Sequence, residues 1–332
     1  MLQNARGVVN AGRLFYNTGA MALTNDFSWS FSRNSTFETC KRRYYYERYG
    51  MWGGWEAADG TRTRTLYLLR QVTSRAAWRG SSVHGMIEQI LKGLRTTRRL
   101  LPLSEAVDRL RERMRSDFRA SKQGLYRTDP KRACRLFEHE YRITVSDEAW
   151  RETYETAERC LRLFYTGGPL RLCQDVGVDH WLDVEELVDF THEGAKVWAK
   201  PDFAYRQPSG APAIIDWKTG RLDPLRESRQ AAVFAFYAAH RWNAAPETVQ
   251  VSEWSLADGA RKVVQVTADF LVSTAAYIRE RIAAMQALLR DPDGNIAVED
   301  DFPMVESPEV CRWCNFRRIC PRGQELFGGA AR

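Results

Sequence analysis

The chain has 332 residues, of which 44% are hydrophobic and 27% are charged, as in a folded soluble protein. Lysine and arginine (49) outnumber aspartate and glutamate (42), and the resulting net charge of +7 fits a polyanionic partner. No apolar run approaches the ~20 residues needed to span a bilayer, and no secretory signal is evident. We therefore expect a cytoplasmic protein without a membrane partner, whose seven cysteines do not form a disulfide framework.

The pattern of apolar residues, turns and breakers divides the chain into five parts. In order, we expect an N-terminal tail (1–26), a segment with a basic, tyrosine-rich helix and a histidine-bearing helix (27–95), a helical insertion (96–176), a strand-rich core (177–267), and a C-terminal helix followed by a cysteine cluster (268–332).

The basic, tyrosine-rich helix interleaves positive and aromatic side chains, among them Arg42, Arg43, Tyr44 and Tyr45. This combination suits single-stranded nucleic acid, because the cations meet phosphates and the rings stack on bases. The alternative is a core helix with a solvated basic face. Taken alone, the stretch favours that alternative.

Two aspartates, Asp202 and Asp216, stand inside otherwise apolar runs that are expected to form neighbouring strands. Buried carboxylates are costly and repel each other unless a cation lies between them. Carboxylate oxygens suit Mg²⁺ or Mn²⁺. Lys218 follows Asp216 by two residues and so points to the same side of its strand. The spacing favours a metal site over the alternative, a buried aspartate–lysine ion pair.

Together with an upstream helix, these residues resemble the PD-(D/E)XK nuclease superfamily. The resemblance narrows to the branch that contains RecB- and AddB-type nuclease domains and CRISPR-adaptation nucleases. Its motifs are matched by Gly80, His84 and Glu88 on the helix, Pro201-Asp202, Asp216-Trp217-Lys218-Thr219-Gly220, and Gln230 on a following helix. A strand glutamate that often precedes the first aspartate is matched by Glu185 or Glu186.

The chain departs from the family pattern at two points. Phe234 stands where a tyrosine usually follows the glutamine motif, and Lys200-Pro201 stands where a glycine is common before the first aspartate. The first departure leaves any hydroxyl role at position 234 in question.

The resemblance implies an α/β fold with a restriction-endonuclease-like core, in which helices flank a mixed central sheet. It also implies that His84, Asp202 and Asp216 hold Mg²⁺ or Mn²⁺. Lys218 would assist the attacking water, and Gln230 would position the water or the scissile phosphate.

A cysteine cluster closes the chain, with Cys311, Cys314 and Cys320 in a C-x2-C-x5-C spacing. Three thiolates need a fourth ligand for zinc or for an iron–sulfur cluster, and Cys40 is a distant partner. Iron–sulfur members of the same nuclease branch place one cysteine before the histidine helix and three after the core. That resemblance implies a [4Fe-4S] cluster that joins the two ends of the chain, with zinc as the alternative.

We therefore expect a metal-dependent deoxyribonuclease that acts on single-stranded DNA or DNA ends, as an exonuclease rather than an endonuclease. DNA repair or recombination, CRISPR adaptation and antiphage defence stay open as its setting. The alternative is a non-catalytic DNA-binding subunit of a helicase–nuclease or integrase complex. No phosphate-binding loop of the G-x-x-x-x-G-K-[ST] type occurs, so an ATP-driven step would need a partner.

Overall fold

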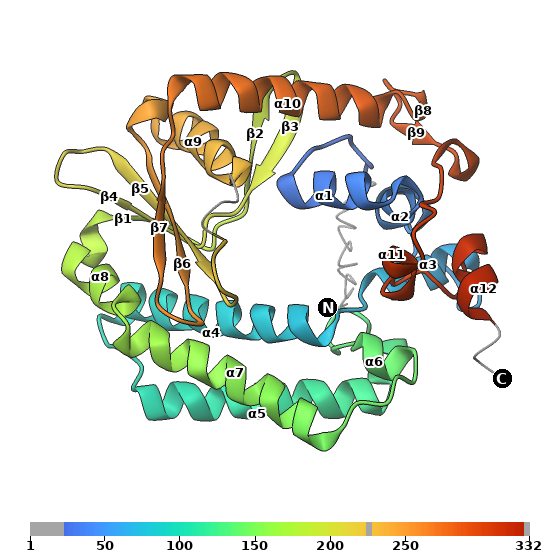
Figure 1. Ribbon diagram of the computed structural model, residues 1–332, viewed down its shortest axis with the longest axis horizontal. Coiled ribbons are helices and arrows are strands. Elements are labelled where there is room, and N and C mark those ends of the chain that lie inside the picture. The colour runs from blue at the N-terminus through green and yellow to red at the C-terminus, as the bar shows by residue number, and fades with distance from the viewer. Residues whose placement is uncertain (1–22, 224–227, 329–332) are drawn as a thin grey trace, which may run out of the picture.

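A five-stranded mixed sheet lies at the centre of the computed structural model, which describes residues 23–223 and 228–328 (Figure 1). The strand order is β1-β4-β5-β6-β7, with bounds Trp181–Val184, Phe203–Arg206, Pro212–Lys218, Gln250–Ser255 and Arg261–Val264. Only β5 and β6 are parallel; the other neighbours are antiparallel. The expected mixed α/β core is confirmed, whereas most of the expected tail (1–26) lies outside the described residues.

Strand β5 forms the middle of the sheet because its sequence is apolar on both faces. Ala213, Ile215 and Trp217 belong to the apolar core on one face, and Ile214 belongs to the core on the other. Such a continuous apolar run is typical of a strand covered by helices on both sides. The parallel step from β5 to β6 requires a crossover, which α9 (Arg229–Trp242) provides.

One face of the sheet is covered by the helices that precede it in the chain. These are α4, α5, α7 and α8, with bounds Arg75–Thr97, Leu103–Lys122, Asp147–Thr166 and Pro169–Val176. Their apolar side chains share one core with β1, β4 and β5. The helices of residues 96–176 thus form part of the main core as well as an insertion.

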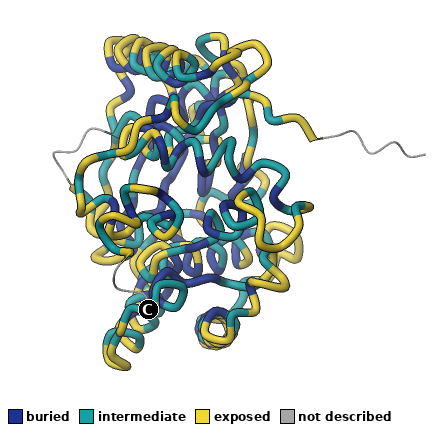
Figure 2. The backbone as a smooth tube through the Cα atoms, turned by 90° about the vertical axis from the view of Figure 1, so that its right-hand side faces the viewer, coloured by how far each residue is buried: buried dark blue, intermediate teal, exposed yellow. Residues whose placement is uncertain are grey.

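The opposite face is covered by α9, by α10 (Ala268–Gln286) and by α1 (Phe31–Thr39), together with the hairpin of β2 (Val188–His192) and β3 (Ala195–Ala199). Figure 2 shows the resulting burial, with buried segments through the centre and exposed ones on the outer helices. Two short strands, β8 (Leu289–Asp291) and β9 (Ile296–Ala297), follow α10.

The two ends of the described chain pack against each other beside α4 (Figure 1). Their apolar cluster joins Tyr46, Leu66 and Phe137 to Phe316 and Cys320. The elements involved are α2 (Lys41–Tyr45), the π-helical turn η1 (Tyr46–Gly50), α3 (Arg62–Arg70), α6 (Phe137–Glu140), α11 (Pro308–Arg312) and α12 (Pro321–Phe327). Four single 3₁₀ turns complete the described elements: Leu125–Arg127, Val178–His180, Pro246–Thr248 and Glu299–Asp301.

Among the described residues, no helix has the length and apolar character required to cross a membrane. All seven cysteines lie in the described part of the chain, and all are free thiols there.

Candidate active site

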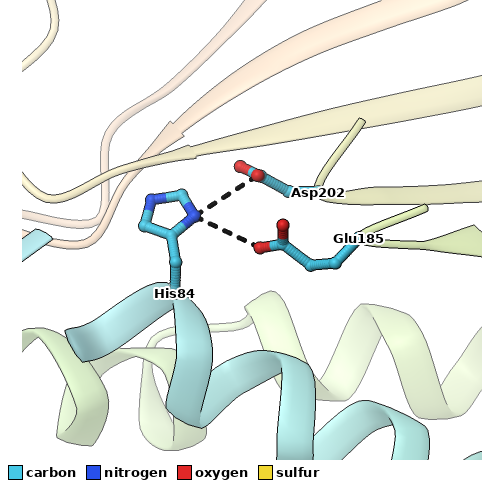
Figure 3. A group of neighbouring side chains, drawn as sticks. All are labelled: His84, Glu185 and Asp202. Atoms are coloured by element: carbon cyan, nitrogen blue, oxygen red, sulfur yellow. Dashed lines mark hydrogen bonds and ion pairs between the residues drawn. The ribbon is translucent and has the colours of Figure 1, made fainter. Parts of the chain in front are cut away.

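Three side chains from distant parts of the chain converge at one end of the sheet (Figure 3). The Nδ1 atom of His84 lies 3.3 Å from Asp202 Oδ1 and 3.4 Å from Glu185 Oε1. One ligand atom from each of these residues lies within 4.8 Å of the other two, a spacing that suits a single metal ion. Within the described chain, no other group of three or more His, Cys, Asp or Glu side chains meets this spacing.

The sheet topology explains why the three side chains meet. β1 and β4 are antiparallel, and so are β4 and β5. The end of β1, the start of β4 and the end of β5 therefore lie side by side at the same end of the sheet. Glu185 follows the last residue of β1 and Asp202 precedes the first residue of β4. His84 reaches them from the middle of α4, which packs beneath this end of the sheet.

The backbone at Glu185 has a conformation that non-glycine residues seldom adopt. Its φ angle is 54°, in the left-handed region, and its N–H donates to the carbonyl of Asp202 over 3.1 Å. Such conformations cost energy and cluster at functional sites. Here the turn brings the Glu185 carboxylate back over Asp202.

Asp202 links the sheet to the cluster. Its Oδ2 accepts a hydrogen bond from the Trp217 N–H over 2.6 Å, while its Oδ1 faces His84. Because a backbone amide holds one oxygen, the direction of the other is set by the fold. The carboxylate is therefore preorganised before any ligand binds.

Asp216 and Lys218 stand beside this cluster on β5. Their side chains form an ion pair in which Asp216 is buried and Lys218 is partly exposed, and the Lys218 ammonium also donates to Gln230 Oε1 over 3.4 Å. Burial and the neighbouring Asp202 carboxylate raise the pKa of Asp216 to about 7, against the opposing effect of Lys218. The structure thus brings together all the expected catalytic residues, with Asp216 next to the three-residue group of closest ligand atoms.

Two further cationic side chains, His84 and Lys200, lie beside these carboxylates. Burial alone would lower the pKa of His84, but Asp202 and Glu185 raise it to about 10. The Lys200 ammonium lies 2.6 Å from Glu185 Oε2. This lysine, at a position where the family often has glycine, was missed as a site residue; its place two residues before Asp202 is the signal that could have indicated it.

The structure distinguishes between the two candidate glutamates. Glu185 is buried in the cluster, whereas Glu186 is about half exposed and faces Lys92 at 3.5 Å. Gly80 of the histidine motif lies against Thr219: a Cβ at this position would be 3.4 Å from Thr219 Oγ1. Phe234 is 2% exposed within an apolar core, so no hydroxyl is required by its surroundings.

The residues expected to contact DNA on the tyrosine-rich helix are largely engaged in the fold. Arg42 is buried, donates to the carbonyl of Phe302 over 2.7 Å and pairs with Glu299. The buried Tyr44 ring stacks on Phe302, and Tyr45 packs at the junction of two cores. Arg43 pairs with Glu47 at 2.8 Å. Arg42 and Tyr44 thus stabilise the junction of the chain ends rather than face an open surface.

The four expected cluster cysteines line one pocket at that junction: Cys40, Cys311, Cys314 and Cys320. Among the described residues, however, no three of their sulfur atoms lie within 4.8 Å of one another. The Arg43 N–H donates to Cys40 Sγ and the Phe316 N–H donates to Cys314 Sγ, each over 3.5 Å. Arg43, Arg317 and Arg322 also line the pocket, and their charges suit a group with anionic thiolate ligands.

One comparison with known proteins agrees with these motifs. The family profile of the PD-(D/E)XK nuclease superfamily matches residues 28–321. A crystal structure titled as a putative exonuclease from Eubacterium rectale aligns over 98% of this chain and 99% of its own, with 12% identity and a TM-score of 0.43. The crystal structure of SSO0001 aligns over 56% of this chain and 78% of its own, with 19% identity and a TM-score of 0.29. A comparison with curated proteins finds no significant match.

The adjacent glutamates provide a matched test of the metal cluster. Glu185→Gln should weaken Mn²⁺ binding at least about tenfold, because it removes an anionic ligand, whereas Glu186→Gln should change it less than about twofold. Isothermal titration calorimetry of the two variants measures this difference. Equal affinities would show that Glu185 is not a ligand.

Mn²⁺ affinity should also fall as the pH falls. A ligand histidine must be neutral, so with a pKa of about 10 in the free protein His84 has to release a proton on binding between pH 7 and 9. Affinity then falls about tenfold per pH unit, and more steeply below about pH 7, where Asp216 is also protonated. Calorimetry in two buffers of different ionisation enthalpy counts the released protons. His84→Ala should release about one fewer near pH 8, and a flat pH profile in the parent would contradict the assignment.

Proposed function

Because this chain belongs to the PD-(D/E)XK nuclease superfamily, we propose that it is a divalent-metal-dependent deoxyribonuclease acting on single-stranded DNA or DNA ends. The observation that carries this proposal is the convergence of His84, Glu185 and Asp202 beside Asp216 and Lys218. Acidic oxygens with one imidazole suit Mg²⁺ or Mn²⁺.

His84, Glu185, Asp202 and Asp216 would hold the ion in this proposal. When bound, the ion lowers the pKa of an attacking water and neutralises charge on the phosphodiester. The chain's own residues supply the rest. The Trp217 N–H fixes the Asp202 carboxylate, and Glu185 is fixed by its backbone bond to Asp202.

Lys218 is the residue that stabilises the negative charge that develops on the phosphoryl oxygens during cleavage. Its ammonium is held between the Asp216 carboxylate and Gln230 Oε1, so its position is set from two sides. From there it orients the attacking water and stabilises negative charge on the phosphoryl oxygens. Gln230 acts in this scheme by positioning Lys218, at the start of α9.

Cleavage of end-labelled single-stranded DNA with Mg²⁺ or Mn²⁺ tests the assignment. Asp216→Asn and Lys218→Met should each lower kcat by about 10² or more, because each removes charge from the reacting centre. The control Arg171→Gln, which removes an exposed charge on α8, should cleave like the parent. Full activity in both site variants would refute the assignment.

A circular single strand in the same assay separates exonuclease from endonuclease action. Linear DNA should be degraded and the circle should resist, because the proposed enzyme needs an end. Binding of DNA without cleavage under any divalent ion would instead favour the alternative, a non-catalytic DNA-binding subunit.

We also propose that Cys40, Cys311, Cys314 and Cys320 bind a [4Fe-4S] cluster. The four cysteines line one pocket, as the ligands of a single group must. The N–H donors to Cys40 and Cys314 are contacts that also stabilise cluster sulfurs.

Iron content and colour test the cluster. Anaerobically purified protein should be brown, absorb near ~400 nm and contain about four irons per chain. Cys314→Ser should lose the iron, and Cys134→Ser, which changes a cysteine outside the pocket, should keep it. Stoichiometric zinc without iron in the parent would refute the proposal.

A further inference from the structure

A second cavity lies between the N-terminal segment and the β2–β3 hairpin, separate from the cysteine pocket. Its volume is about 210 Å³. One side is lined by residues 24–28 and by parts of α1, α2 and η1 and their flanks. Lys196 and Trp198 of β3 and Asn295 complete the lining. Three hydrogen bonds connect the lining residues: Asn25 Nδ2 donates to the Arg48 carbonyl, Tyr49 Oη to Asn295 Oδ1, and Asn295 Nδ2 to the Asn25 carbonyl. These bonds fix the positions of residues that lie far apart in the sequence.

The charges around this cavity are unbalanced. Arg33 and Arg48 line it, Arg70 lies near both, and within the described chain no carboxylate lies within 4 Å of any of the three guanidinium groups. The Nε atoms of Arg48 and Arg70 are buried without a hydrogen-bond partner. Burial, with Arg33 and Arg70 nearby, lowers the pKa of Arg48 to about 10. Half-buried cations of one sign, such as these three arginines, are stabilised when an anion joins them.

Two acids also line the cavity, but neither forms an ion pair with these arginines. Glu47 pairs with Arg43 at 2.8 Å and acts on Arg48 from beyond ion-pair distance, and Asp26 pairs with none of the three. Aromatic side chains also line the cavity, among them Tyr49, Trp52 and Trp198. Guanidinium groups beside aromatic rings are the combination that binds nucleotides, through the phosphate and the base.

A strip of outward-facing side chains connects the cavity to the metal cluster. Ala195, Val197 and Ala199 of β3 are buried, so Lys196 and Trp198 point to the other side, and Lys200 continues that alternation. Lys196 and Trp198 line the cavity, whereas Lys200 contacts Glu185 of the cluster. At ~3.3 Å per residue, Trp198 lies about 7 Å along the strand from Lys200.

We propose that this cavity is a nucleotide subsite: it binds a phosphate between Arg33 and Arg48 and stacks a base on Trp198 or Trp52, next to the phosphodiester that is cleaved. The inference rests on the proposed nuclease function and specifies where its substrate strand lies. Lys196 and Lys200 guide the strand between the subsite and the metal cluster.

Steady-state cleavage of linear single-stranded DNA between 50 and 200 mM salt tests the subsite. Arg48→Gln and Lys196→Gln should each raise KM about tenfold with less than about twofold change in kcat, since both remove binding that the ground state and the transition state share. Each should also reduce the slope of log KM against log salt by about 0.7, the loss of one phosphate contact to a single strand.

Trp198→Ala separates stacking from charge. It should raise KM roughly five- to a hundredfold and leave the salt slope unchanged, because stacking releases no counterions. Arg171→Gln, far from the cavity on α8, is the charge-matched control and should match the parent. Unchanged Mn²⁺ affinity verifies that each variant is folded; Lys196 is exposed, so its variant serves even where Arg48→Gln fails to fold.

The outcomes separate the subsite from the nuclease function. Active parent protein whose Lys196 and Trp198 variants keep the parental KM and salt slope would overturn the subsite. A parent that cleaves nothing refutes the nuclease function instead. The same variants are then compared by fluorescence anisotropy of a labelled oligonucleotide, where unchanged affinity and slope overturn the subsite as well.

Discussion

Three carboxylates meet at one end of the central sheet, and their mutual repulsion is the constraint on which the site depends. Glu185, Asp202 and Asp216 are all buried, so solvent screens them little. Each carboxylate is paired with a cation from a different element. Asp202 faces His84 of α4, Glu185 faces Lys200 after β3, and Asp216 faces Lys218 at the end of β5. Asp202 and Glu185 raise the pKa of His84 against the effect of burial, and burial together with Asp202 raises the pKa of Asp216. A divalent cation at this site would take the place of the proton on His84.

The same end of the sheet explains the arrangement of the surrounding helices. The start of β4 lies beside the end of β5 only because the two strands are antiparallel, and the parallel step to β6 then places α9 across the opposite face. Gln230 at the start of α9 can therefore reach Lys218 from that side, while His84 approaches from α4. The active-site residues are thus held by helices on both faces, which limits how far any one of them can shift without disturbing a core.

Local periodicity predicted part of this site, and the remainder depended on long-range contacts. Asp216 and Lys218 are two residues apart, so strand geometry predicts that they point to the same side of β5. Their side chains do pair with each other there, and Lys218 also contacts Gln230. Glu185 could not be separated from Glu186 by sequence, because the choice depends on the left-handed turn directly after β1. For Arg42 and Tyr44 the sequence left two alternatives open, because aromatic residues three to four apart suit both a DNA-binding face and a core helix. Contacts with Phe302, about 260 positions away, favour the core helix.

The junction of the chain ends also explains why Arg42 and Tyr44 of the basic helix are buried beside the proposed nucleotide subsite. Cys40 caps α2, and the Arg42 guanidinium binds Glu299 and the Phe302 carbonyl, so the C-terminal segment anchors this helix through Arg42. Arg48 and Tyr49 follow on η1, and their positions in the cavity depend on that anchorage and on Asn295. The metal cluster, by contrast, depends on α4 and the sheet. If the cavity binds the substrate strand as proposed, the cysteine pocket lies on the substrate-contact side of the protein, and a group that ties its four cysteines together would stabilise that surface rather than the metal cluster.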